Sequence, residues 1–265
     1  MDKIVIVKIG GNVIDDPPAL EKLLTDFATL QGAKILVHGG GKLATDMASQ
    51  LNVPQKMVNG RRITDLETLK ITTMVYAGLI NKQIVASLQS KKNNAIGLSG
   101  ADGNSIQSEK RKVVETDYGF VGDIHTNSVN LPFIKSILEL GITPVFSAIT
   151  HDGQNQLLNT NADTIASALA VALSGFYNVQ LNYCFEKKGV LKDMEDDNSV
   201  IETMTPRYYK ELLKDGIISK GMIPKLDNAF EAIQKGVKSV LIAHSNDLLN
   251  TTHENKHAGT KLIAG

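Results

Sequence analysis

The sequence predicts an α/β protein built around a doubly wound, mostly parallel sheet. Two β-branched runs, residues 4–7 and 35–38, are each followed by a glycine turn and then by apolar residues at helical spacing. Alternation of strand, turn and helix is typical of βα units, whose parallel strands are covered by helices on both faces. Hydrophobic residues make up 42% of the 265 residues and charged residues 21%, which suits a globular protein with a large core.

Composition excludes several other classes of protein. The 28 Lys and Arg balance the 28 Asp and Glu, so we expect no broad electrostatic binding to nucleic acid or to an acidic membrane. The single cysteine, Cys184, excludes an internal disulfide and a multi-cysteine zinc site. No apolar run approaches the roughly 20 residues of a membrane helix, and the N-terminus lacks the basic region of a signal peptide. A soluble, cytoplasmic protein is therefore expected.

Glycines and capping residues mark the first elements. The strand 4–7 ends in a glycine turn, and Asp16 before Pro17 is a typical start for a helix that Gly32 ends. The second glycine turn opens a helix to about Leu51. The remaining elements expected before Gly175 are a helix over 65–91, a strand over 96–98, a hairpin-like lid over 105–124, a helix over 132–140, a strand over 142–147 and a helix over 162–173 that is apolar on almost every side.

The chain divides near Gly175 into two lobes, residues 1–175 and 176–265. In the second lobe we expect strands over 179–185 and 240–242 and helices over 205–214 and 222–235.

Two glycine turns are candidate anion sites. Lys8 ends a buried strand just before Gly10 and Gly11, where doubly wound sheets bind ligands, although a solvated lysine beside a tight turn has the same sequence. The turn 39–41 exposes consecutive amides at a helix N-terminus. It is neither a P-loop, because Leu43 stands where Ser or Thr is needed, nor a well-supported dinucleotide fingerprint, because no acidic residue ends a following strand. The preceding histidine, His38, is interpreted as structural.

Three further segments carry polar residues in unusual places. Arg62 and its neighbour Arg61 fall in a loop, and a guanidinium is the preferred partner of a carboxylate or phosphate. In 159–163 we expect Asn161 to cap the apolar helix, which leaves Asn159 without a structural task. In 219–225 a lysine lies close to a helix start, which is unfavourable unless an anion offsets its charge.

Together these segments resemble the amino-acid kinase family, and within it the branch that phosphorylates acylated glutamate. The stretches that carry the resemblance keep the family order: Lys8-Ile9-Gly10-Gly11, Val37-His38-Gly39-Gly40-Gly41, Asn59-Gly60-Arg61-Arg62-Ile63-Thr64, Gly97-Leu98-Ser99-Gly100-Ala101-Asp102-Gly103, Asn159-Thr160-Asn161-Ala162-Asp163 and Gly221-Met222-Ile223-Pro224-Lys225.

The resemblance implies an open, mostly parallel eight-stranded sheet between helix layers, with an N-lobe that binds the acylated amino acid and a C-lobe that binds ATP. It implies phosphorylation of the side-chain carboxylate of N-acetyl-L-glutamate, an early step of arginine biosynthesis, by a homodimer that pairs through its N-lobes. Magnesium is expected mainly on the ATP phosphates. A carboxylate is already ionised at neutral pH, so the reaction needs no general base.

The same resemblance implies a role for each matching residue. The catalytic set is Lys8 and Lys225, which neutralise the transferring phosphoryl group, and Asp163, which holds both lysines. The substrate-binding set is Gly40, Gly41, Arg62, Asn159 and Asn161, with Arg62 on the α-carboxylate. The nucleotide-binding set is Gly10, Gly11, Gly189, Val190, Leu191, Ile217, Ile218 and Ser219, and no residue is expected to be a metal ligand.

One segment departs from the family pattern. Residues 183–191 lack the aspartate that the family usually places there, and Glu186 is only a possible substitute. Lys220 stands where many relatives have aspartate. Both departures fall on the nucleotide side.

Two alternatives remain open at this point. The same reaction on N-succinyl-L-glutamate would need one further cationic partner, which Arg61 could supply. A non-catalytic sensor that kept the fold would have no need of Lys8, Asp163 and Lys225 together.

The helix 65–91 carries apolar residues on more than one face. A surface helix needs only one apolar stripe, so the remainder is expected to meet a second copy of the chain. The apolar residues of this helix, on all of its faces, include Leu69, Met74, Val75, Leu79, Ile84 and Leu88.

Overall fold

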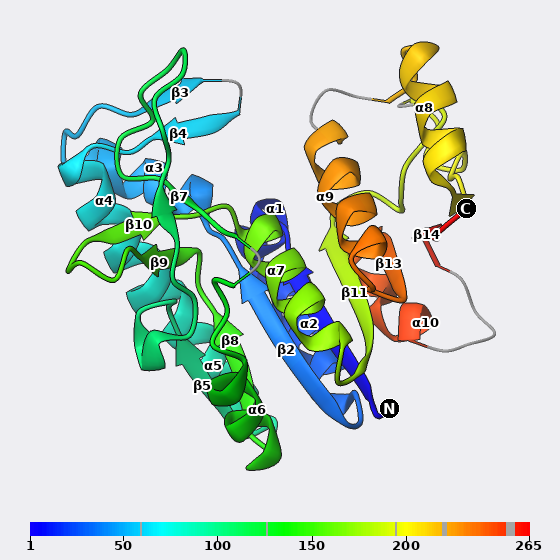
Figure 1. Cartoon of the computed structure of the whole chain (residues 1–265), viewed down its shortest axis with the longest axis horizontal. Helices are drawn as coiled ribbons and strands as arrows, with labels where there is room; N and C mark the ends of the chain where they lie inside the picture. The colour runs from blue at the N-terminus through cyan, green and yellow to red at the C-terminus, as the bar shows by residue number, and fades with distance from the viewer. Residues whose placement is uncertain (59, 126, 194, 219–221, 253–257) are drawn as a thin grey trace.

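The computed structural model describes residues 1–58, 60–125, 127–193, 195–218, 222–252 and 258–265. A central sheet of eight strands runs through the molecule in the order β12-β14-β13-β11-β1-β2-β8-β5 (Figure 1). Only β14 against β13 is antiparallel. The strands are β1 Lys3–Ile9, β2 Ala33–His38, β5 Ala95–Leu98, β8 Thr143–Phe146, β11 Asn178–Phe185, β12 Thr203–Met204, β13 Ser239–His244 and β14 Thr260–Leu262.

Helices cover both faces of this sheet. Helices α7 and α9 pack against each other on one face, and α2, α5 and α10 form the opposite layer (Figure 1). The expected open, mostly parallel sheet between helix layers is therefore confirmed. The α-helices are α1 Gly11–Ile14, α2 Pro17–Thr29, α3 Gly41–Gln50, α4 Leu66–Thr73, α5 Asn81–Ser90, α6 Leu131–Glu139, α7 Ala162–Ser174, α8 Pro206–Lys214, α9 Ile223–Gln234 and α10 Leu248–Thr252.

Strand β1 is the topological switch point of the sheet. Its neighbours are β2 on one side and β11 on the other. The strands β2, β5 and β8 lie on one side of β1, and the later strands β11 to β14 lie on the other side. In open α/β sheets the crevice beyond the carboxyl ends of such strands is where ligands bind. Lys8 lies next to the end of β1, in register with Val37 and Tyr183 of the flanking strands.

Local signals in the sequence explain where the main helices begin. Asp16 accepts a hydrogen bond from the N–H of Ala19, and Pro17 takes the first helical position of α2. Asn161 accepts from two amides in the first turn of α7. No residue of α7 from Ala162 onward is exposed, as its apolar sequence predicts.

The helix expected over 65–91 is present, but its middle is not α-helical. Between α4 and α5, residues Met74–Ile80 (η1) form a π-helix. Sequence patterning does not distinguish this segment from an α-helix, and π-helical turns are frequently found at functional sites.

Small antiparallel pairs surround the carboxyl edge of the sheet. They are β3 Lys56–Val58 with β4 Arg61–Ile63, β9 Ile149–His151 with β10 Leu157–Asn159, and β6 Glu109–Lys110 with β7 Gly122–Asp123. The last pair lies in the segment 105–124, although only two residues on each side are strand. The expectation that Arg61 and Arg62 lie in a loop is wrong, because both belong to β4. Within the described part of the chain, no helix is both long enough and apolar enough to cross a membrane.

Candidate active site

A cleft with a volume of about 630 Å³ opens at the carboxyl edge of the sheet. It gathers residues from β1, the turn before α3, the β3–β4 hairpin, β10, the start of α7 and the start of α9. Its lining includes Lys8, Gly11, Gly40, Gly41, Arg61, Arg62, Tyr76, Arg111, Asn159, Asn161, Asp163, Lys225 and Asp227.

Two lysines converge on one buried carboxylate at this edge. Lys8 Nζ lies 2.8 Å from Asp163 Oδ1, and Lys225 Nζ donates to Asp163 Oδ2 at 2.8 Å. Lys8 and Asp163 are 8% and 7% exposed. Lys8 and Lys225 are 155 and 62 residues away from Asp163 in the sequence. The fold brings them together because β1 ends, and α7 and α9 begin, at this edge of the sheet.

The electrostatics of this cluster favour an anion. Burial alone would raise the pKa of Asp163, but the two ammonium groups outweigh it and lower that pKa to about 2. Burial lowers the pKa of Lys8, and the like charge of Lys225 lowers it further while Asp163 opposes the shift. Two positive charges share one negative charge, so the cluster retains a net positive charge that can neutralise a bound phosphate or carboxylate.

The glycine turn before α3 can exist only with glycine at its centre. Gly40 has φ of +144°, a conformation that L side chains rarely adopt, and an added Cβ would overlap Ile80 Cδ1 from the π-helical segment. Gly41 begins α3, where the unpaired amides of a helix N-terminus are available to an anion.

The first glycine pair is only partly available. The N–H of Gly10 donates to the carbonyl of Cys184 at 2.8 Å, so this amide holds β11 beside the turn. Gly11 lines the cleft and has no neighbouring atom within 4 Å of an added Cβ. The structure therefore brings Gly11 to the cleft, and Gly10 supports the turn from behind.

Arg62 is buried and links the β3–β4 hairpin to α3. Its Nη1 donates to Gln55 Oε1, and its Nη2 donates to the carbonyl of Gly41 at 2.7 Å and to Thr45 Oγ1 at 2.9 Å. These contacts fix the guanidinium at the wall of the cleft.

The two asparagines before α7 have different surroundings. Asn161 Oδ1 accepts from the N–H groups of Asp163 and Thr164, as the sequence predicts for a helix cap. Asn159 Nδ2 donates to Thr64 Oγ1 at 3.0 Å, and that hydroxyl donates in turn to the carbonyl of Arg62 at 3.3 Å. These contacts use Asn159 Nδ2, and Asn159 also lines the cleft, where its Oδ1 can act only as an acceptor.

Of the residues expected on the nucleotide side, Gly11 lines the cleft, but Gly189, Val190, Leu191, Ile217 and Ile218 are not among its lining residues. Val190 donates its N–H to Thr260 Oγ1 and is buried, as are Leu191 and Ile218. An added Cβ at Gly189 would meet Thr260 Oγ1 at 2.8 Å, so this glycine allows close packing against β14. Ile217 lies half-buried and packs against the hydrophobic core, while Ser219 lies outside the described residues.

Some lining residues were not found by sequence reasoning. Tyr76, Asp227 and Arg111 reach the cleft from a helix interior or from an irregular segment. No glycine turn or capping pattern marks their positions, so only the tertiary fold brings them to the site. Asp227 accepts a hydrogen bond from the Tyr209 hydroxyl at 2.8 Å, which ties α8 to α9.

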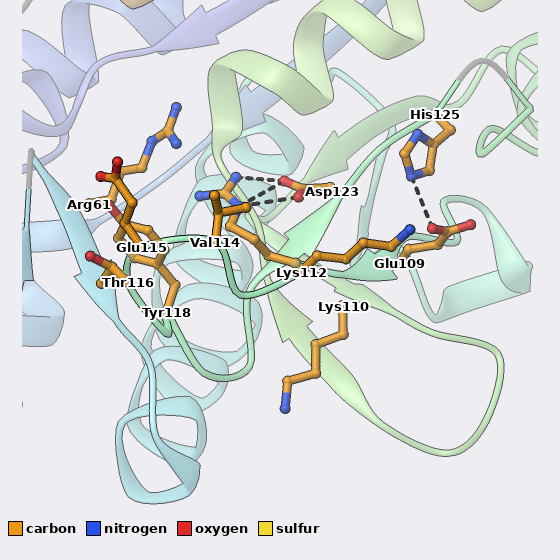
Figure 2. Close-up of a pocket in the computed structure, with 11 residues that line it drawn as sticks. Arg61, Glu109, Lys110, Lys112, Val114, Glu115, Thr116, Tyr118, Asp123 and His125 are labelled. Atoms are coloured by element: carbon orange, nitrogen blue, oxygen red, sulfur yellow. Dashed lines mark hydrogen bonds and ion pairs between the residues drawn. The ribbon is translucent and has the colours of Figure 1, made fainter.

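A second pocket of about 490 Å³ adjoins the cleft and shares Arg61 and Arg111 with it. Figure 2 shows the residues that line it, with dashed lines between Arg111 and Asp123 and between His125 and Glu109. Arg111 Nε lies 3.1 Å from Asp123 Oδ1, and His125 Nε2 lies 3.4 Å from Glu109 Oε2. These pairs brace the segment 105–124 beside the cleft.

Comparison with known proteins gives consistent relatives. The model of the Amino acid kinase family matches residues 3–244. An acetylglutamate kinase of Cytophaga hutchinsonii is 57% identical over all of this chain and all of its own, and one of Parabacteroides distasonis is 51% identical over 99% of this chain and 100% of its own. The fold also resembles a solved N-acetylglutamate synthase of Neisseria gonorrhoeae, with a TM-score of 0.84, 19% identity, and coverage of 98% of this chain and 59% of that one.

Proposed function

The chain belongs to the amino acid kinase family, and from that premise we propose that it is an acetylglutamate kinase. It transfers the γ-phosphoryl group of ATP to the side-chain carboxylate of N-acetyl-L-glutamate and forms an acyl phosphate, a step of arginine biosynthesis. Full-length relatives of this name at 51% and 57% identity support the activity. The observation in the molecule that carries the proposal is the pairing of Lys8 and Lys225 with Asp163 at the mouth of the cleft.

The reaction needs alignment and charge neutralisation rather than a base. An oxygen of the ionised carboxylate attacks the γ-phosphorus, and the bond from that phosphorus to the bridging oxygen breaks as ADP leaves with its electron pair. Lys8 and Lys225 neutralise the charge that spreads over the transferred group, while Asp163 fixes both ammonium groups. The amides of Gly11 and Gly41 donate to the phosphoryl oxygens.

The acylated amino acid occupies the side of the cleft formed by the glycine turn, β4 and β10. Arg62 binds its α-carboxylate through its charge and through the N–H groups of Nη1 and Nε that its contacts with Gln55, Gly41 and Thr45 do not use. Asn159 Oδ1 accepts the N–H of the acylamide, and the amides of Gly40 and Gly41 help to seat the substrate. Asn161 contributes through its cap on α7, which holds Asp163 in place.

ATP approaches from the lobe that begins after residue 175, which brings Lys225 to the γ-phosphate. We assign the N-lobe, residues 1–175, to the acylated amino acid and the C-lobe, residues 176–265, to the nucleotide. We expect Mg²⁺ to be bound mainly by the ATP phosphates, because it is usually held by substrate phosphates and only one or two carboxylates. When bound there, Mg²⁺ supplies further neutralisation of phosphate charge. An ATP-consuming biosynthetic role suits the cytoplasm.

The protein acts as a homodimer that pairs through the helix 66–90. Leu69, Val75 and Ile84 of this helix are buried within the chain, but Leu66, Met74 and Leu79 are 49%, 55% and 41% exposed. Large apolar side chains gathered on one element are typical of an interface. A second copy of the chain would cover them.

A coupled ADP-release assay tests the function directly. N-acetylglutamate, N-succinylglutamate, glutamate, aspartate and carbamate are offered side by side at equal concentration. Turnover with N-acetylglutamate well above that with glutamate, aspartate and carbamate is expected. A non-catalytic sensor would release no ADP with any of them.

One observation favours N-succinyl-L-glutamate as a second candidate substrate. Arg61 and Arg111 line the cleft in addition to Arg62, so a cation is available for an extra carboxylate on the acyl group. If turnover with N-succinylglutamate exceeds that with N-acetylglutamate, the second candidate replaces the first while the phosphoryl transfer stays the same.

A further inference from the structure

The buried histidine before the glycine turn is held by a complete set of hydrogen bonds. His38 ends β2 and is 0% exposed. Its Nδ1 lies 2.9 Å from the carbonyl oxygen of Gly39, and its Nε2 lies 3.0 Å from Asn81 Nδ2. Asn81 begins α5, directly after the π-helical segment, and is itself 1% exposed.

The surroundings of Asn81 determine which nitrogen of His38 carries the proton. Asn81 Nδ2 also donates to the carbonyl of Val145 at 2.9 Å, and Asn81 Oδ1 accepts from Lys82 Nζ at 3.1 Å. If the amide were turned over, its oxygen would face the oxygen of Val145. Nδ2 is therefore the atom that faces His38, and since it can only donate, Nε2 must accept. The ring hydrogen is then on Nδ1, where it donates to Gly39.

Charge on the ring is disfavoured as well. Burial, together with a smaller effect of the Lys82 ammonium, lowers the pKa of His38 to about 4, although the hydrogen bond with Gly39 opposes the shift. The neutral ring keeps one donor and one acceptor, which match the single acceptor and single donor that it meets.

We infer that His38 is a positioning residue that orients the Gly39–Gly40 peptide of the active-site glycine turn, with Asn81 fixing the tautomer that allows it. The peptide is planar and trans, so a carbonyl of Gly39 held against the ring turns the N–H of Gly40 the opposite way. Gly40 lines the cleft, and we assign its N–H to a bound anion there. This inference rests on the proposed function, because it assigns the Gly40 amide to the same substrate.

The neighbouring contacts explain why the turn needs such a restraint. Gly40 is in a backbone conformation with positive φ that has no side chain of its own to hold it. Tyr76 and Ile80 pack over its open side, and His38 fixes its preceding peptide from the sheet side. The π-helical segment and Asn81 thus support the turn from one continuous helix.

Two substitutions separate the two ring nitrogens. In His38→Asn the side-chain N–H can occupy the place of Nδ1 and still donate to Gly39, whereas in His38→Gln the amide lies near Nε2 and that donor is lost. We expect His38→Gln to lower kcat/KM for the acylated substrate at least about tenfold, mainly through a higher KM, because the Gly40 amide seats that substrate. KM for ATP should change less than about twofold, because binding at the nucleotide subsite does not use this amide. His38→Asn should recover most of the lost kcat/KM.

A matched control variant distinguishes a loss of positioning from a general loss of folding stability. Asn93 is a buried amide whose Nδ2 donates to Thr143 Oγ1 at 3.0 Å beside the same sheet, away from the glycine turn. Asn93→Ala is expected to lower the thermal midpoint without a change in kcat/KM for the acylated substrate. If His38→Gln and His38→Asn lose kcat/KM equally, or if neither loses more than Asn93→Ala, the positioning role is wrong.

The tautomer of His38 can be measured in the wild-type protein, so this test does not depend on the activity of a variant. Long-range ¹H–¹⁵N spectra of the wild-type protein at pH 7 should show His38 protonated on Nδ1 and unprotonated on Nε2, with the resonance assigned by its absence from His38→Asn. A proton on Nε2 would overturn the inference. A wild-type protein that shows the expected tautomer but no turnover with any acylglutamate would instead contradict the proposed function.

Discussion

At the scale of single residues, Lys8 and Lys225 share Asp163 but come from different lobes. Their neutralising effect acts mainly on the charge that develops during transfer. We therefore expect Lys8→Ala and Lys225→Ala each to lower kcat at least about tenfold, with a smaller change in KM for the acylated substrate. Steady-state kinetics with both substrates varied measure this. Losses below tenfold in both variants would remove the lysines from the catalytic set.

The surroundings of Lys8 also predict a pH dependence. Burial, and then the charge of Lys225, lower the pKa of Lys8 from its ordinary value of 10.5. The ammonium form is the one that neutralises phosphate, so kcat should fall as pH rises, beginning below pH 10.5. An arginine stays protonated throughout this range, so the alkaline limb of the kcat profile should move to higher pH in Lys8→Arg. An unchanged limb in that variant would assign the titration to another group.

Arg62 predicts the opposite kinetic behaviour. A lysine in its place loses the planar guanidinium and the simultaneous contacts with Gln55, Gly41 and Thr45 that fix it at the cleft. We expect Arg62→Lys to raise KM for the acylated amino acid about tenfold or more while KM for ATP stays within twofold. A KM effect confined to ATP would place Arg62 in the nucleotide subsite.

At the scale of elements, the helix 66–90 has two tasks. Its inner side supports Gly40 through Tyr76 and Ile80, and its outer side carries exposed apolar residues. A glutamate in an apolar interface would be buried without a partner. Met74→Glu should therefore convert the homodimer to a monomer in light scattering at micromolar concentration. Leu140→Glu, at a site 74% exposed on the end of α6, is the control that should leave the mass unchanged. A wild-type monomer would contradict the interface.

Long elements with strong local signals were predictable, and short ones were not. The β-branched run of β1 and the cap at Asp16 mark their elements without help from the rest of the chain. Strands β12 and β14 have two and three residues, and they exist because neighbouring strands supply their hydrogen bonds. The β3–β4 hairpin was missed for the same reason, which is why Arg62 was expected in a loop.

The candidate site likewise contains some features that the sequence predicts and others that it does not. Lys8 and the glycine turn follow predicted strands, so their meeting at one edge of the sheet follows from a parallel topology. The hydrogen bond between His38 and Asn81 joins residues that are 43 positions apart. The sequence carries no local signal for this contact or for the π-helical segment, because both depend on packing between elements.

At the scale of the whole molecule, the sheet brings both halves of the chain to one cleft. Strand β1 lies between β2 and β11, and Lys8 near its end meets Asp163 of α7, which also pairs with Lys225 of α9. We propose on this basis that residues 1–175 bind the acceptor and residues 176–265 the nucleotide, with Asp163 pairing one lysine from each part.

The most direct test of this account is detection of the product itself. Wild-type protein is incubated with ATP, Mg²⁺, N-acetyl-L-glutamate and hydroxylamine, which converts an acyl phosphate to a stable hydroxamate. The account predicts one side-chain hydroxamate for each ADP released, and loss of both products in Lys225→Ala. Release of ADP without hydroxamate from either the acetylated or the succinylated substrate would show hydrolysis of ATP instead, and would contradict phosphoryl transfer to the carboxylate.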